Sequence, residues 1–248
     1  MIDTVKFFEE KKYVLIKEMI PKEIAKIASQ YSHFDRVRKF QPEDHKAQIP
    51  GSHSVYGDPL METLLKFSTP HMEKWTGLKL WPTYSYYRLY KPGDMLKRHK
   101  DRPSCEVSIT CCLGYDYKDK KDYNWGMYVG PENGERGTKG KMIPMEPGDG
   151  VIYRGCEIEH WREAFEVPEG AWQTQVFLHY VNQEGPYADF CKFDSRPSLG
   201  IPHDFKDKDK VRAAGEADKE LNYRQRDREG KWPELNKEDV PYENREKE

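Results

Sequence analysis

A histidine and an aspartate two residues apart, His99 and Asp101, are the first residues in this chain whose spacing suggests chemistry. They lie in the segment RHKDRPS, shortly after a Pro-Gly turn. In an extended segment, residues i and i+2 point to the same side, so one imidazole and one carboxylate can reach a single metal ion. A lone His-x-Asp pair is common by chance, and by itself it is more often part of a solvated loop.

A second histidine, His160, supplies the missing partner. It ends the segment PGDGVIYRGCEIEH, in which a Pro-Gly-Asp turn leads into an apolar run. Two histidines and one carboxylate on opposite strands of a small barrel match the facial triad of non-haem Fe(II) oxygenases, which leaves open positions on the metal. Alone, His160 would be interpreted as a buried barrel histidine. Together with His99 and Asp101, it predicts a metal site.

Elements before residue 80 are predicted to be mainly helical. A short strand is expected from Tyr13 to Ile16. Prolines at helix starts then predict three helices. They begin at Pro21, at Pro59 after the cap residue Asp58, and at Pro70 after Thr69. The apolar stripe expected on the first of these helices consists of Ile20, Ile24, Ile27 and Tyr31.

After Leu80 the pattern changes to short strands. Six segments are rich in β-forming residues and are separated by Gly- and Pro-containing turns; they are TYSYYRLY, CEVSITCCLGY, WGMYVG, GKMIPM, DGVIYRG and AWQTQVFLHYV. No spacer among them is long enough for a regular crossover helix. This pattern favours an antiparallel barrel or sandwich over a parallel α/β sheet.

Composition narrows the class of protein and its compartment. The 248 residues have a net charge of -2, which gives no overall attraction to nucleic acid. No apolar run approaches the roughly 18 residues needed to cross a bilayer, and the N-terminus lacks a signal-peptide core. Five cysteines, an odd number without a CxxC pair, argue against a disulfide framework or a cysteine-based zinc site. We therefore expect a cytoplasmic protein.

From about Phe7 to Tyr180 the sequence resembles the Fe(II)/2-oxoglutarate-dependent dioxygenases, in the style of the prolyl-hydroxylase and phytanoyl-CoA-hydroxylase branches. The segments that carry the resemblance are FFEEKKYVLIKEMIPKEIAKIA, YKPGDMLKRHKD and PGDGVIYRGCEIEH. The resemblance implies a mainly β fold with N-terminal helices, in which the core is a double-stranded β-helix (jelly-roll, cupin-like). It also implies that His99, Asp101 and His160 hold Fe(II), with 2-oxoglutarate as cosubstrate and O2 as oxidant.

The implied activity is hydroxylation of an unactivated C–H bond, with release of succinate and CO2. The substrate is not identified by the sequence, and a peptidyl proline, an amino acid and a small metabolite all fit. The expected organisation is a dioxygenase domain over residues 1–200, with helical support at 1–80 and the β-core at 81–183, followed by a charged C-terminal extension at 201–248. Nucleic acid and membrane are not expected partners, and the oligomeric state stays open.

The expected anchor of the cosubstrate is where the sequence departs from the family. Many members place Arg or Lys about ten residues beyond the distal histidine to bind the C5 carboxylate, but the segment EVPEGAWQTQ has no basic residue. A carboxylate inside a barrel needs a cationic or multi-donor partner. Arg88, which alternates with Tyr86 and Tyr90 on one strand face, is the leading candidate. Arg162 is the second.

Three further residues complete this prediction. Tyr90 matches the family tyrosine that commonly bonds the cosubstrate, and Gln175 offers additional hydrogen bonds, as does Gln173. Arg102 and Glu106, which flank the metal loop, are expected to pair with each other or to brace the loop. His179 is expected to be structural, because no ligand partner is spaced with it in the sequence.

Two other classes of protein remain open at this point. One is a cupin-like metalloprotein that uses the same triad without 2-oxoglutarate, which the missing distal base favours. The other is a non-catalytic binding module, in which the triad is coincidental and the charged extension is an interaction surface.

Overall fold

The computed structural model describes residues 3–39, 48–130 and 139–201. Apart from Ile201, the predicted C-terminal extension lies outside these residues. The helical elements are α1 (Thr4–Lys11), α2 (Lys22–Arg38), α3 (Pro59–Thr76), α4 (Ala188–Cys191) and the 3-10 turns η1 (Pro103–Cys105) and η2 (Lys192–Ser195). The strands are β1 (Tyr13–Ile16), β2 (His53–Tyr56), β3 (Leu80–Tyr90), β4 (Leu96–His99), β5 (Val107–Asp116), β6 (Met127–Val129), β7 (Lys141–Ile143), β8 (Gly150–Tyr153), β9 (His160–Arg162) and β10 (Trp172–Asn182).

The strands form two antiparallel sheets within the described residues. The larger sheet has the order β1-β8-β5-β10-β3-β2, and the smaller one has the order β4-β9-β6-β7. Neighbours in each sheet are often far apart in the chain, as in β3 with β10 and β4 with β9. This is the jelly-roll arrangement that the sequence predicts. The smaller sheet carries the two histidines, because β4 ends at His99 and β9 begins at His160.

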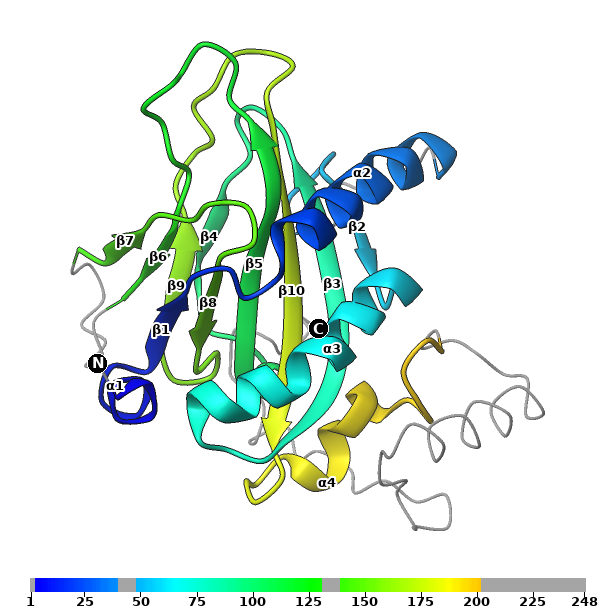
Figure 1. Cartoon of the computed structure of the whole chain (residues 1–248), viewed down its shortest axis with the longest axis vertical. Coiled ribbons are helices and arrows are strands. Elements are labelled where there is room, and N and C mark those ends of the chain that lie inside the picture. Colours follow the sequence, from blue (N-terminus) through cyan, green and yellow to red (C-terminus); the bar gives the residue numbers. More distant parts are fainter. Residues whose placement is uncertain (1–2, 40–47, 131–138, 202–248) are drawn as a thin grey trace, which may run out of the picture.

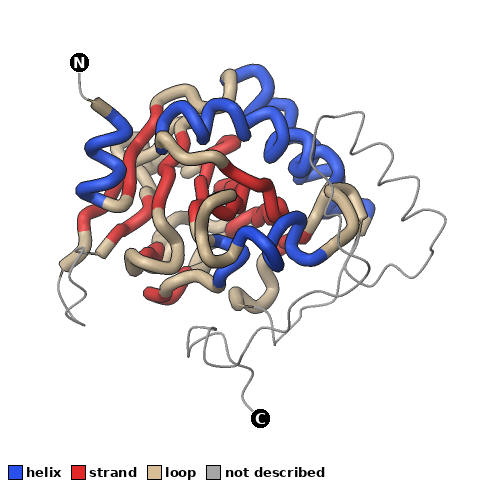
Figure 2. The backbone as a smooth tube through the Cα atoms, turned by 90° about the horizontal axis from the view of Figure 1, so that it is seen from below, coloured by secondary structure: helices blue, strands red, loops and turns tan. Residues whose placement is uncertain are grey.

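The long helices cover the outer face of the larger sheet (Figures 1 and 2). Alternate residues of β10 divide between two environments. Val176, Leu178 and Tyr180 belong to the hydrophobic core shared with α1, α2 and α3, whereas Gln175 and His179 are buried outside that core. The sheet therefore directs apolar side chains to the helices and polar ones into the barrel, as the two-residue period of a strand requires.

The stripe predicted for helix α2 is confirmed in part. Ile20 is buried, and Ile24 and Tyr31 pack partly buried against the core, but Ile27 is 60% exposed. The fully buried residues of the helix are the small or polar Ala25, Ala28, Ser29, Ser32 and Asp35. The physical reason is close packing on the sheet. A Cβ on Gly114 of β5 would lie 2.9 Å from the Ser29 hydroxyl, so only small side chains fit between helix and strand there.

The two helices predicted to begin at Pro59 and at Pro70 are one helix, α3, with Pro70 inside it. Proline normally interrupts a helix because it lacks an N–H and its ring crowds the preceding turn. Here the buried face continues across Pro70, from Leu64 and Leu65 to Met72, and packs against the sheet. Burial of that face offsets the lost hydrogen bond.

None of the described helices is long and apolar enough to cross a membrane. Helix α1 was not predicted.

The buried carboxylate of Asp35 connects α2 to the sheet. It accepts a hydrogen bond from the Tyr87 hydroxyl (2.6 Å) and pairs with Arg38 (2.9 Å) and Lys39 (3.0 Å). Burial opposes its charge, but Tyr87 and the two cations outweigh burial and lower the pKa of Asp35 to about 2.

Replacing Asp35 with Asn should therefore change how stability depends on pH. A carboxyl with a lowered pKa stabilises the folded state above its unfolded pKa and loses that contribution as the pH falls toward the folded pKa. We expect wild type to lose about 2 kcal/mol more than Asp35→Asn between pH 5 and pH 2. Urea unfolding of both proteins across this range measures the difference. If the free energy of unfolding changed equally with pH in the two proteins, the lowered pKa of Asp35 would be contradicted.

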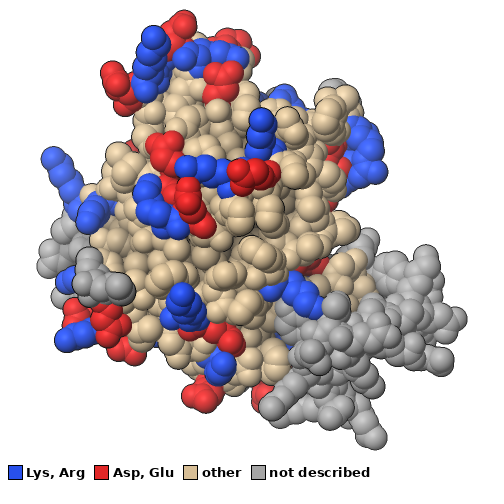
Figure 3. Space-filling model, in the orientation of Figure 1, with Lys and Arg blue, Asp and Glu red and all other residues tan. Residues whose placement is uncertain are grey.

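Charges of both signs are mixed on the face of the molecule shown in Figure 3, without a large area of Lys and Arg alone. A basic surface is the usual mark of nucleic-acid binding, and this face does not present one.

Candidate active site

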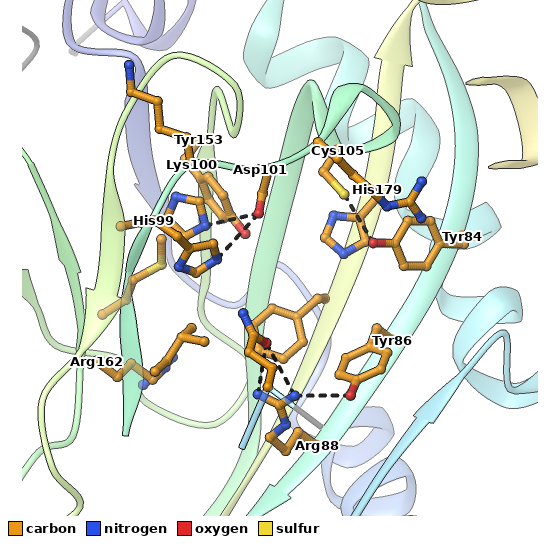
Figure 4. Close-up of a pocket in the computed structure, with 16 residues that line it drawn as sticks. Tyr84, Tyr86, Arg88, His99, Lys100, Asp101, Cys105, Tyr153, Arg162 and His179 are labelled. Atoms are coloured by element: carbon orange, nitrogen blue, oxygen red, sulfur yellow. Dashed lines mark hydrogen bonds and ion pairs between the residues drawn. The ribbon is translucent and has the colours of Figure 1, made fainter. Parts of the chain in front are cut away.

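The fold brings His99, Asp101 and His160 together. Figure 4 shows the side chains of His99 and Asp101 beside the cavity. His99 and His160 are direct partners in the β4–β9 ladder. Asp101 follows β4 in the loop before η1, and its Oδ1 lies 3.5 Å from Nε2 of His99 and 3.3 Å from Nε2 of His160. Three ligand atoms, from two neighbouring strands and the loop after β4, thus lie close together, as a facial triad requires.

The hydrogen bonds of the two imidazoles define which nitrogen is available. His99 Nδ1 lies 2.7 Å from the carbonyl of Lys97, and His160 Nδ1 lies 3.1 Å from the carbonyl of Ile158. A carbonyl only accepts, so each Nδ1 carries a proton. In the neutral imidazole Nε2 is then the nitrogen that can bind a metal ion, and in both histidines it is the atom that lies beside Asp101. A backbone carbonyl on the second nitrogen is the usual support of a metal-binding histidine.

Asp101 has an unusual environment for a carboxylate. Its Oδ2 is buried without a hydrogen-bond partner among the described residues. Burial opposes the charge, but His160 and His99 outweigh it and hold the pKa of Asp101 well below its usual range. A buried, charged oxygen without a donor is expensive unless it binds a cation. Together with the two Nε2 atoms that lie beside Asp101 Oδ1, these observations fit a divalent metal ion.

Backbone contacts fix the position of Asp101. Its N–H donates to the carbonyl of Gly155 (2.9 Å). A Cβ on Gly155 would lie 2.5 Å from Asp101 Oδ2 and 2.3 Å from the carbonyl of Cys105. The absence of a side chain at Gly155, the last residue of the PGDGVIYRG segment, therefore permits the loop that carries Asp101 to lie close to the end of β8.

Arg102 braces this loop from the other side, but not through the partner that the sequence suggests. Its guanidinium makes a two-pronged pair with Asp194 of η2 at 2.6 and 2.7 Å, whereas Glu106 accepts from the backbone N–H of Asn182. Phe193, Asp194 and Ser195 all have positive φ, a conformation that turns Asp194 inward. Asp194 in η2, which follows β10 in the chain, thus fixes the side chain of Arg102, the residue next to Asp101.

A cavity of about 300 Å³ opens beside the triad. Besides the triad, its walls are formed by thirteen residues from both sheets and the adjoining loops: Gln48, Tyr84, Tyr86, Arg88, Leu96, Lys100, Arg102, Cys105, Met127, Tyr153, Arg162, Phe177 and His179. The structure therefore places both candidate anchors, Arg88 and Arg162, in the same cavity as the triad. Their roles stay predictions.

The two arginines are buried without a carboxylate partner among the described residues. Arg162 is 0% exposed; it donates to the carbonyl of Trp125 (2.6 Å) and lies 3.7 Å from the Met145 sulfur. Arg88 is 2% exposed and donates to the Tyr86 hydroxyl (3.0 Å) and, over 3.3 and 3.4 Å, to the Gln48 amide oxygen. Burial lowers the pKa of Arg162, but a guanidinium remains charged in proteins.

The other two predicted cosubstrate residues lie behind the cavity wall. The Tyr90 ring is within 6 Å of both guanidinium carbons, at 5.6 Å from Arg88 and 5.9 Å from Arg162. Gln175 faces Arg88 in the β3–β10 ladder and accepts from Thr110. The Tyr90 hydroxyl and the Gln175 amide nitrogen are both buried without a partner. Gln173 instead bonds Tyr117 and the Trp125 carbonyl.

Sequence reasoning missed a second group beside the triad, formed by Tyr84, Cys105 and His179. The Tyr84 hydroxyl lies 3.1 Å from the Cys105 sulfur, and His179 Nδ1 lies 2.8 Å from the Ser108 hydroxyl. Burial raises the pKa of Cys105, so the thiol is neutral. Cys105 and His179 also lie close enough to Asp101 to form an alternative ligand group. The i, i+2 spacing of Gln175, Phe177 and His179 places them on one face of a strand, and this spacing could have predicted that His179 lies on the same side as Gln175.

Three solved structures illustrate the likeness of this fold to known proteins. A prolyl-4-hydroxylase from Pseudomonas putida is 15% identical, with coverage of 73% of this chain and 99% of that chain and a TM-score of 0.54. The α-ketoglutarate-dependent carbocyclase SnoK of nogalamycin biosynthesis is 16% identical, with coverage of 83% and 94% and a TM-score of 0.55. HygX from Streptomyces hygroscopicus, with nickel and 2-oxoglutarate bound, is 11% identical, with coverage of 74% and 88% and a TM-score of 0.53.

No protein-family model and no curated protein matches the chain. The structural likeness, at low identity, establishes the fold: a double-stranded β-helix of the kind found in the 2-oxoglutarate- and Fe(II)-dependent oxygenases. The predicted fold class is thereby confirmed.

Proposed function

We propose that this protein is an Fe(II)- and 2-oxoglutarate-dependent oxygenase that hydroxylates a C–H bond of a substrate. The observation that carries the proposal is the convergence of His99, Asp101 and His160, with both Nδ1 protons bound to backbone carbonyls. In the overall reaction 2-oxoglutarate, O2 and R–H give succinate, CO2 and R–OH. The chain would act in the cytoplasm, where its free, mostly buried cysteines stay reduced.

The residues of the chain would divide the task as follows. His99, Asp101 and His160 would hold Fe(II), which supplies the chemistry with O2 when it is bound. Asp101 offers the negative charge, and the histidines offer neutral nitrogens whose orientation the carbonyls of Lys97 and Ile158 fix. The barrel walls would exclude bulk water and position the reacting C–H bond.

Arg162 would bind the C5 carboxylate of 2-oxoglutarate. It lies two residues beyond His160 on β9 and therefore on the same side of that strand. It is fully buried, and its hydrogen-bond partners among the described residues are a carbonyl and a sulfur. A buried guanidinium without an anion is costly, and a carboxylate bound by its planar fork would remove that cost. Arg162 would thus replace the basic residue that is missing about ten residues beyond His160. The absence of that residue had favoured a cupin-like protein that does not use 2-oxoglutarate.

The ligands of a structural neighbour support this assignment of cofactors. HygX holds nickel and 2-oxoglutarate in its structure. The neighbours include a prolyl-4-hydroxylase and a carbocyclase, so the fold alone leaves the substrate and the fate of the C–H bond open.

Anaerobic addition of Fe(II) and 2-oxoglutarate to the purified protein should produce a weak visible charge-transfer band. The band requires 2-oxoglutarate to chelate the metal, so Fe(II) alone or 2-oxoglutarate alone should not produce it. Absence of the band, together with absence of succinate formation after O2 is admitted, would contradict the proposed function.

A further inference from the structure

The cavity contains more positive charge than the proposed reaction needs. Its charged lining residues are Arg88, Lys100, Asp101, Arg102 and Arg162. Arg102 is neutralised by its two-pronged pair with Asp194, and Asp101 would be offset by the metal. If Arg162 takes the C5 carboxylate of 2-oxoglutarate, the buried cation left without an anion is Arg88.

Arg88 is oriented for a ligand in the outer part of the cavity. Its Nη atoms reach the Gln48 amide oxygen, and Gln48 is an exposed residue. The partners of Arg162, in contrast, are the carbonyl of Trp125 and the sulfur of Met145, and both of these residues are buried. Arg162 therefore occupies the inner end and Arg88 the end nearer to solvent. A cosubstrate that enters first would fill the inner end.

The partners of Arg88 are neutral and incomplete. The bonds to Gln48 are long, its Nε is buried without a partner, and Tyr86 contributes one hydroxyl. Close by, the Tyr90 hydroxyl and the Gln175 amide nitrogen also lack partners. Buried polar groups are normally satisfied, and the exceptions among the described residues here are Arg88 in the cavity wall and two groups directly behind it, which points to a ligand that completes the bonds of Arg88. The shared need of these donors is an acceptor with negative charge.

We propose that Arg88 binds a carboxylate of the primary substrate, so that the substrate class is small organic acids, amino acids included. The inference rests on the proposed function, since it assigns the inner arginine to 2-oxoglutarate. A carboxylate matches the planar fork of Arg88 with two parallel hydrogen bonds. Lys100 lines the same cavity and adds attraction for an anion. The cavity of about 300 Å³ is near the lower end for ligand pockets, which favours a small substrate.

The test uses a pair of probes of nearly the same size and shape, butyrate and butyramide, in which an NH2 group replaces one oxygen of the charged carboxylate. Both are added to the full-length protein loaded with Mn(II) and saturating 2-oxoglutarate, and relaxation of the probe protons by Mn(II) reports binding near the metal. We expect butyrate to bind and butyramide to bind at least about tenfold more weakly. Equal relaxation of the two probes would overturn the proposal, and this comparison needs no variant.

The variant Arg88→Gln tests whether Arg88 supplies the positive charge that binds butyrate. We expect the Kd of butyrate to rise about tenfold, while the Kd of 2-oxoglutarate changes less than about threefold. Arg36→Gln, which removes an exposed charge on α2, should leave both constants unchanged. If Arg88→Gln leaves butyrate binding intact, or weakens 2-oxoglutarate about tenfold or more, Arg88 does not bind the substrate carboxylate. If wild type fails to bind 2-oxoglutarate at all, the proposed function itself falls.

Discussion

Replacing Asp101 with Ala should remove metal binding. Asp101 is the anionic member of the triad, and its Oδ1 lies within 3.5 Å of the Nε2 atoms of His99 and His160. Without it, two neutral imidazoles remain, which hold a divalent ion weakly. We expect the Kd of Mn(II), measured from the free-ion signal in electron paramagnetic resonance, to rise about 100-fold or more, since even residues that only support metal ligands cost about 10- to 100-fold.

A matched control separates this effect from a general loss of charge. Asp116, at the end of β5, pairs with Lys118 on the surface. Asp116→Ala should leave the Kd of Mn(II) unchanged. An Asp101→Ala protein that is folded by circular dichroism and binds Mn(II) within about threefold of wild type would exclude Asp101 as a ligand.

Replacing Arg162 with Gln should weaken 2-oxoglutarate without weakening the metal. Removing one partner of a buried charge pair costs about 2–5 kcal/mol in binding, which at the lower end is a loss of about 30-fold. Calorimetric titration of 2-oxoglutarate into the Mn(II)-loaded variant measures this change. The Kd of Mn(II) should remain within about threefold of wild type, because Arg162 does not belong to the triad.

Stability distinguishes a binding role of Arg162 from a structural one. Among the described residues its side chain has no carboxylate partner, so without ligand its charge is uncompensated. A neutral glutamine in the same place should leave the free energy of unfolding of the ligand-free protein unchanged within about 1 kcal/mol, or raise it. A loss of several kcal/mol, with unchanged affinity for 2-oxoglutarate, would show that Arg162 only supports the barrel.

The triad could be predicted from the sequence because its geometry is local. The i, i+2 spacing of His99 and Asp101 places them on one side of an extended segment, and a turn-then-strand segment carries His160 to the neighbouring strand. The alternation of Tyr86, Arg88 and Tyr90 likewise predicted a shared face. The same rule applied to β10 would have brought His179 to attention.

Other features depended on packing that a single sequence does not contain. The exposure of Ile27 on α2 follows from the close packing of Ser29 on Gly114, where a Cβ added to the glycine would lie 2.9 Å from the Ser29 hydroxyl. The depth of Arg162 relative to Arg88 depends on how the two sheets face each other. The pair between Arg102 and Asp194 joins residues far apart in the chain through left-handed backbone at η2.

The central claim is that this barrel binds 2-oxoglutarate through a metal held by His99, Asp101 and His160. Calorimetric titration of 2-oxoglutarate into wild-type protein, with and without Mn(II), tests it most directly. One binding site whose affinity depends on Mn(II) is the expected result. Absence of binding in both titrations, or equal affinity with and without the metal, would contradict the claim.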